Sequence, residues 1–203
     1  MSNVIGHFVE VDPSEFLVLV SLQLLPAAQP VEWSHWGTTA DFVTSYFGMF
    51  LGLAPANGDG QTKETYESSA LRYILNELIE NAVKFNQGGT ILVQVGLVAR
   101  EMVLLVENVV TEIVGTQLRP KLVELISQDP TELFLRRVEE RAENPEDDDS
   151  GLGFITMMSD YEARLGWKLS PVEADRSRIT LSTMARLSVQ DDTVLPRSAN
   201  GGR

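Results

Sequence analysis

Apolar residues recur along this chain with two different periods, and the two periods predict its helices and strands. From Glu64 to Phe85 they come at three- and four-residue steps, the spacing of one buried face of a helix. Similar patterns predict helices over 33–53, 116–127, 131–143 and 152–165. Short runs of β-branched and large apolar residues predict strands over 3–11, 15–25, 90–98, 101–108, 167–173 and 178–189.

The order of these elements predicts the fold class. We expect an α+β two-layer sandwich, with helices on one face of a mixed, mainly antiparallel sheet. Residues 1–189 are expected to form one domain, because no linker-like segment divides them. The polar segment 190–203 is predicted to be a disordered tail.

Composition narrows the classes of function. The 203-residue chain has no cysteine, which excludes disulfides, thiolate metal sites and cysteine nucleophiles. Its formal net charge of −13 argues against non-specific binding to nucleic acid. The apolar run from Phe16 to Leu25 is too short to span a bilayer, and the first residues do not resemble a signal peptide. We therefore expect a cytoplasmic protein without membrane contacts.

Two short segments carry the candidate chemistry. Glu77 and Asn81 are four residues apart in the long predicted helix, so they lie on the same face one turn apart and could hold a water or a metal ion. The segment Ser150-Gly151-Leu152-Gly153-Phe154 predicts a glycine turn that opens another helix. Backbone N–H groups at such a helix start suit phosphate. Each segment is a weak signal alone, but their order, with strands between and after them, is far more specific.

These segments resemble a known family. The run Asn76-Glu77-Leu78-Ile79-Glu80-Asn81-Ala82-Val83-Lys84-Phe85 is similar to the N-box of the GHKL, or histidine-kinase-like, ATP-binding domains, and Ser150–Phe154 is similar to their second glycine box. The resemblance covers roughly residues 65–188, and ends with a Leu165-Gly166 turn and two strands. It is strongest to stand-alone anti-sigma serine kinases and SiaB-like protein kinases. It implies a Bergerat fold, with N-terminal elements over 1–63, a nucleotide-binding core over 64–189 and a two-helix lid over 109–150.

The resemblance also implies roles for single residues. Asn81 would coordinate Mg²⁺ that bridges the nucleotide phosphates. Glu77 would act as the general base of phosphoryl transfer. Lys84 would lie near phosphate, or else be a solvated cation near the helix end. Gly151, Leu152 and Gly153 would bring backbone N–H groups to the phosphates.

One family motif is missing. Family members carry an Asp-x-Gly-x-Gly box whose Asp accepts a hydrogen bond from the adenine amino group. Asn108 stands at the Asp position, and Val109 and Val110 follow it without the glycines. A neutral amide is a weaker acceptor than a carboxylate, and the valines are expected to narrow the space around the base and sugar.

The sequence therefore supports two hypotheses. The first is a stand-alone regulatory protein that binds ATP or ADP with Mg²⁺ and phosphorylates or sequesters a small STAS-like protein on Ser or Thr; a homodimer is compatible with it. The second is a non-catalytic sensor that holds an adenine-containing cofactor, such as FAD, in a reshaped GHKL pocket. The missing glycine box leaves open whether the protein is an enzyme.

Overall fold

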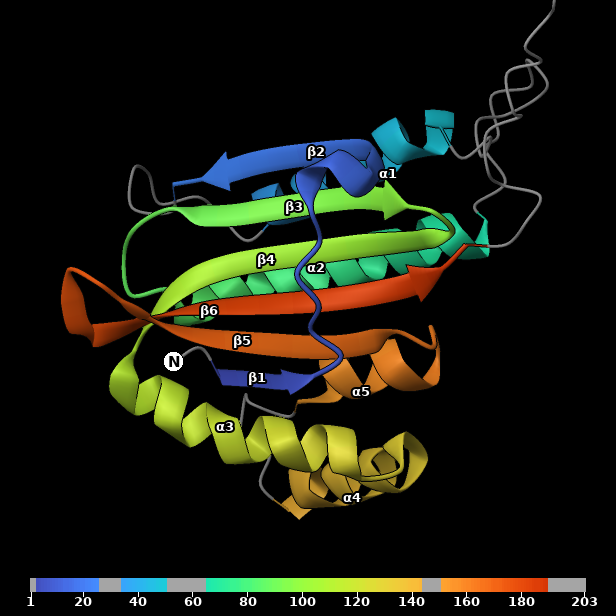
Figure 1. Ribbon diagram of the computed structural model, residues 1–203. Helices are drawn as coiled ribbons and strands as arrows, with labels where there is room; N and C mark the ends of the chain where they lie inside the picture. Colours follow the sequence, from blue (N-terminus) through green and yellow to red (C-terminus); the bar gives the residue numbers. More distant parts are fainter. Residues whose placement is uncertain (1–2, 26–33, 51–64, 144–150, 190–203) are drawn as a thin grey trace, which may run out of the picture.

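A six-stranded sheet forms one layer of the molecule. The computed structural model describes residues 3–25, 34–50, 65–143 and 151–189. The strands follow the order β1-β5-β6-β4-β3-β2, and every pairing between them is antiparallel (Figure 1). Their bounds are β1 Asn3–Gly6, β2 Phe16–Leu24, β3 Ile91–Val98, β4 Glu101–Thr111, β5 Arg164–Val172 and β6 Asp175–Ser188.

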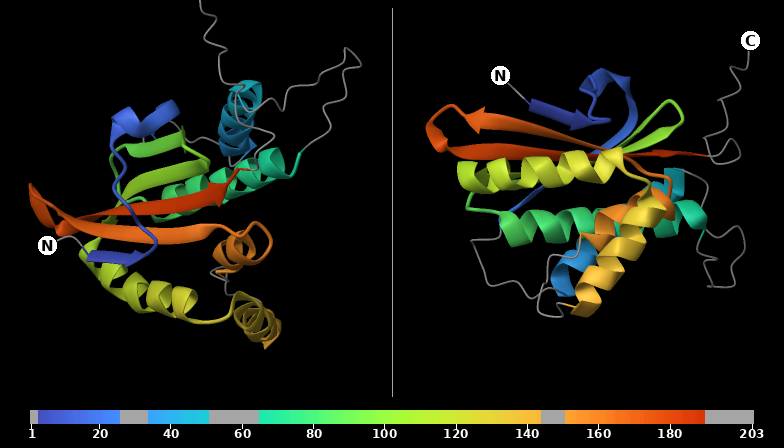
Figure 2. Two further views of the ribbon diagram at one scale, coloured as in Figure 1. Left: turned by 45° about the vertical axis from the view of Figure 1, so that its right-hand side comes forward. Right: turned by 90° about the horizontal axis from the view of Figure 1, so that it is seen from below.

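The helices form the second layer on one face of this sheet (Figure 2). Helix α2 packs against β3 and β4, α3 against β1, β4 and β6, and α4 lies outermost against α5. This arrangement confirms the predicted α+β sandwich, although the described sheet is wholly antiparallel and not mixed. The helices are α1 Ser34–Phe50, α2 Tyr66–Phe85, α3 Glu112–Ser127, α4 Pro130–Glu143 and α5 Leu152–Ser159, and a short 3₁₀ helix spans Pro13–Glu15.

Helix α2 forms the centre of the helical layer because its sequence provides both an N-terminal cap and an apolar face that packs on the sheet. Thr65 is its N-cap, and Thr65 and Ser68 form a capping box in which each side chain bonds the other's backbone N–H. Its apolar stripe, which includes Ile74 and Leu78, is buried against alternating residues of β3 such as Val93. The face carrying the candidate residues therefore has a fixed position above the sheet.

The first strand is shorter than predicted. It ends at Gly6, whose φ of 68° turns the chain out of the sheet. Because β1 and β2 lie at opposite edges, the connection between them crosses the face opposite the helices (Figure 1). Gly166 leaves room for this crossing, because a Cβ there would lie 2.0 Å from the Phe8 nitrogen. Gly96 of β3 instead makes room for the Phe16 ring at the start of β2, which would lie 2.2 Å from a Cβ at that position. The prediction of a strand over 3–11 is therefore wrong beyond Gly6.

Helix α5 is also shorter than predicted, since 152–165 was expected and the helix ends at Ser159. The Ala163 N–H donates to the Met157 carbonyl at 2.9 Å, and Glu162 has a φ of 52°, so the chain turns at this point. Leu165 and Gly166 then belong to β5 and do not form the expected turn. The buried Leu165 side chain points into the core, and Gly166 faces the crossing segment.

The lid region contains the two helices that were predicted, α3 and α4, although α3 begins four residues earlier than 116 because Thr111 caps it. The predicted tail 190–203 and the end of the lid, 144–150, lie outside the described residues. Among the described helices, none is both long enough and apolar enough to cross a membrane.

Candidate functional site

One cavity of about 530 Å³ lies between the helical layer and the sheet. Its walls come from α2, α3, α4 and the start of α5 on one side, and from β4, β5 and β6 on the other. All of the site residues predicted from the sequence line this cavity. They are Glu77, Asn81 and Lys84 of α2, Asn108 of β4, and Gly151, Leu152 and Gly153 at the start of α5.

Helix α2 presents two carboxylates to the cavity. Glu77 is half-buried, and burial followed by the charge of Glu80 raises the pKa of its carboxyl group. Glu80 also lines the cavity and accepts a hydrogen bond of 2.6 Å from the Asn76 side chain. A partly desolvated carboxylate with a raised pKa is a stronger proton acceptor than an exposed one, so Glu77 has the properties that a general base needs.

The glycine turn contacts Glu77 directly. Gly151 has a φ of 62° and is the N-cap of α5, where it makes no side-chain cap hydrogen bond. Gly153 does not have a left-handed φ, and a Cβ built on it would lie 2.1 Å from the Glu77 Oε2 atom. The absence of a side chain at Gly153 is therefore what allows the Glu77 carboxylate to lie over the start of α5.

Asn108 lies on the opposite wall of the cavity. It is 4% exposed, and its Nδ2 atom has no hydrogen-bond partner within the described part of the chain. A buried amide donor without a partner is costly, and such groups mark places where a ligand can supply the bond. Thr183 of β6 lines the same wall and is also buried.

The missing glycine box is replaced by continuous strand. Asn108, Val109 and Val110 all pair with β6, so the strand continues through these positions without a loop. The Asn86 side chain also accepts a hydrogen bond from the Val109 N–H, which joins the end of α2 to this strand. Neither valine lines the cavity, and Val110 is buried in the core. The expectation that these valines narrow the pocket is wrong, because α3 supplies the apolar wall there.

Helix α3 contributes a stripe that the sequence reading missed. Its residues recur at three- and four-residue steps, and this spacing could have identified the stripe in the sequence. The residues of the stripe that line the cavity are Val114, Gln117, Leu118, Lys121, Leu122 and Leu125. Arg137 of α4 lines it as well. With Lys84, Lys121 and Arg137 the cavity lining has three cationic side chains against the two carboxylates of Glu77 and Glu80, a positive excess that favours an anionic ligand.

The donor set suits Mg²⁺ held mainly by a bound phosphate ligand. The described residues contain no group of three or more His, Asp or Glu side chains that could hold a metal alone. Asn81 offers one hard amide oxygen at the cavity wall. Mg²⁺ commonly takes one or two protein ligands, with phosphate oxygens and waters completing its octahedron. The residues present therefore fit a Mg²⁺–nucleotide complex.

Comparison with known proteins gives one structural relative. No protein-family model matches the chain, and no curated protein matches it significantly. The structure is similar to a chain in the crystal structure of the SiaB–SiaC complex from Pseudomonas aeruginosa, with a TM-score of 0.56 and 14% sequence identity. The alignment covers 85% of this chain and 91% of that chain. At this identity, the similarity shows a shared fold.

Proposed function

We propose that this protein is a stand-alone regulator of the GHKL type, which binds ATP or ADP with Mg²⁺ in the cavity beneath α3 and acts on a protein partner. One observation carries the proposal. The N-box, the glycine turn and the strand before the missing box lie far apart in the sequence, yet their side chains line a single cavity. Their order along the chain matches that of a GHKL nucleotide site. The cavity also has cationic side chains at its wall and a buried amide group with no hydrogen-bond partner among the described residues.

Each residue has a definite task in this proposal. A bound Mg²⁺–ATP supplies the phosphoryl group. Asn81 would hold the metal through its amide oxygen, and backbone N–H groups at the start of α5 would hold phosphate oxygens. Glu77 accepts the proton of the incoming Ser or Thr hydroxyl group, and Gly153 leaves the space in which its carboxylate lies. Asn108 offers its amide to the base, as asparagine does when it pairs with both a donor and an acceptor of adenine.

Two features support a small partner protein, which we propose is STAS-like. The structural relative was crystallised in a complex named for two proteins. Next to the cavity, helices α3 and α4 also expose large apolar side chains, a feature of surfaces that contact other proteins. Those exposed on the two helices are Ile113, Val123, Ile126, Phe134, Leu135 and Val138.

A second candidate function follows from the wall that replaces the glycine box. Neutral Asn108 and the apolar side chains Val114, Leu118 and Leu122 make this wall suitable for a larger adenine-containing cofactor such as FAD. The protein would then be a non-catalytic sensor. In this case the cofactor would remain bound during purification, and Glu77 would not transfer protons.

The two candidates are separated by the ligand itself. The full chain is purified, any ligand is released by denaturation, and the supernatant is examined by absorbance and mass; the protein is then titrated with Mg²⁺–ATP by calorimetry. ATP or ADP in the supernatant, or saturable binding of Mg²⁺–ATP, would support the regulator. A flavin spectrum would support the sensor. No ligand and no binding would contradict both.

A matched pair of variants tests whether the cavity is the binding site. Asn81→Ala removes an amide that lines the cavity, and Asn76→Ala removes an amide of the same helix that does not line it. We expect Asn81→Ala to weaken Mg²⁺–ATP binding and Asn76→Ala to leave it near that of the parent. Equal effects of the two substitutions would place the nucleotide elsewhere.

A further inference from the structure

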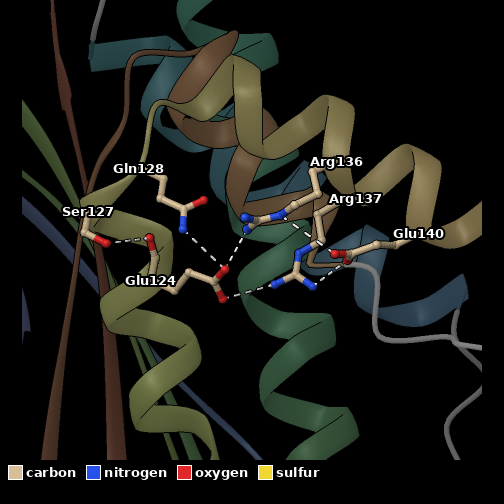
Figure 3. A network of polar contacts seen from close by, with 6 residues as sticks. All are labelled: Glu124, Ser127, Gln128, Arg136, Arg137 and Glu140. Atoms are coloured by element: carbon tan, nitrogen blue, oxygen red, sulfur yellow. Dashed lines mark hydrogen bonds and ion pairs between the residues drawn. The ribbon is translucent and has the colours of Figure 1, made fainter.

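Two adjacent arginines of α4 share the same carboxylates, but only one of them borders the cavity. Arg136 and Arg137 both form ion pairs with Glu124 of α3 and with Glu140 of α4 (Figure 3). Arg137 lines the cavity, whereas Arg136 does not. Arg136 therefore only connects α4 to α3, whereas Arg137 makes the same connection and also borders the cavity.

The contacts of the two arginines with Glu124 differ in length. Arg136 Nη2 lies 2.6 Å from Glu124 Oε1, which is a close charge-assisted hydrogen bond. Arg137 Nη2 lies 3.5 Å from Glu124 Oε2, and this longer ion pair has no accompanying hydrogen bond between the two described side chains. Arg137 also donates to Glu140 at 2.9 Å. Of the two contacts with Glu124, the Arg137 contact is therefore the easier one for an anion in the cavity to replace.

Arg137 lines the same cavity as the glycine turn, where phosphate is expected. Helix α4 packs against α5, and the start of α5 carries Gly151 as N-cap and Gly153 in its first turn. A guanidinium group binds a phosphate with two parallel N–H···O bonds, and the terminal phosphate of a nucleotide carries more negative charge than one carboxylate. A terminal phosphate near this turn would therefore compete with Glu124 for Arg137.

We propose that Arg137 recognises the terminal phosphate of a nucleoside triphosphate by exchanging Glu124 for it, and so couples the position of α4 to the nucleotide that is bound. The inference rests on the proposed nucleotide-binding function. Glu124 keeps its bond to Arg136 when Arg137 leaves, so α4 remains attached to α3 while the contact nearest the cavity changes. A diphosphate lacks the group that Arg137 recognises, and leaves the Arg137–Glu124 pair in place.

Calorimetric titration of the full chain with Mg²⁺–ATP and with Mg²⁺–ADP tests this inference. Arg137→Gln should weaken ATP binding by about ten-fold or more, because it removes charged hydrogen bonds to phosphate. ADP binding should change by less than about three-fold, because its contacts do not involve Arg137. Arg136→Gln is the matched control: it loses the shorter bond to Glu124, yet should leave both affinities near those of the parent.

A conservative variant and a second readout separate recognition from folding. Arg137→Lys keeps the charge without the two-point geometry, so it should restore part of the ATP affinity. Hydrogen exchange of α4 in the parent should differ between the ATP and ADP complexes, and this difference should vanish in Arg137→Gln.

Three results would overturn the inference alone while the parent still binds nucleotide. They are equal losses for ATP and ADP in Arg137→Gln, no loss for either nucleotide, or the same ATP loss in Arg136→Gln. A parent that binds neither nucleotide would overturn the inference together with the proposed function.

Discussion

Replacing Gly153 by alanine should separate nucleotide binding from phosphoryl transfer. The new Cβ would lie 2.1 Å from Glu77 Oε2, where ordinary contacts begin at 3.4 Å. The carboxylate must therefore move by more than about 1 Å, and a displacement of that size can cost roughly 10²-fold in rate. The end of a flexible side chain can make this movement, so the fold should be retained. Alanine also favours a helix over glycine by up to about 1 kcal/mol.

Gly151→Ala is a control on the same turn, because it should lower stability without moving Glu77. Among the described residues, no atom lies within 4 Å of a Cβ at Gly151, but its φ of 62° is strained for alanine. This strain costs about 1–2 kcal/mol, and should lower the Tm by about 2–8 °C. Glu77 is not displaced, so the Gly151→Ala protein should keep the parent's rate wherever it is folded.

The assay combines three measurements on both variants. Thermal unfolding reports stability, calorimetry reports Mg²⁺–ATP affinity, and single-turnover release of phosphate from ATP reports transfer to water. We expect Gly153→Ala to bind ATP, to be at least as stable as the parent and to release phosphate roughly 10²-fold more slowly. A Gly153→Ala protein that releases phosphate at the parent's rate would refute the role given to the Glu77–Gly153 contact.

Three further predictions follow from the same cavity. Burial and then the charge of Glu80 raise the pKa of Glu77. The folding stability that depends on protonated Glu77 is therefore present at low pH and is lost as the pH rises through that pKa. Glu77→Gln should therefore have a higher Tm than the parent at about pH 7 and no advantage near pH 4, and a constant advantage at every pH would contradict this linkage. In Asn81→Ala, the affinity for ATP should lose most of its dependence on Mg²⁺, and calorimetry with and without the metal would detect a dependence that persists. Asn108→Leu should raise the Tm by removing an unpartnered buried donor, worth about 1–3 kcal/mol, and should weaken ATP binding; unchanged affinity would exclude Asn108 from the base site.

The sequence was sufficient where local patterns determine the structure. The three- and four-residue spacing of apolar side chains in α2, with Thr65 before it, predicted both the helix and the face on which Glu77 and Asn81 lie. The alternation along β3 is equally local, since each second residue is buried against the helices. Both patterns depend on neighbours along the chain and need no knowledge of the tertiary fold.

The sequence was insufficient where distant segments meet. The end of β1 depends on the crossing segment that Gly166 accommodates, and nothing near Gly6 in the sequence indicates this crossing. The contact between Gly153 and Glu77 joins two segments that only the folded chain brings together. Arg137 was likewise inside the predicted lid, but its cavity-facing position depends on how α4 packs against α5.

The central claim is that an adenine nucleotide binds in the cavity between α2, α3, α5 and the sheet. Photolabelling of the full chain with 8-azido-ATP in the presence of Mg²⁺, followed by identification of the modified peptides, tests it most directly. The label should fall on β4 and α3, around Asn108 and Leu118, and excess ATP should suppress it. Labelling that ATP does not suppress, or label confined to surfaces away from this cavity, would contradict the account.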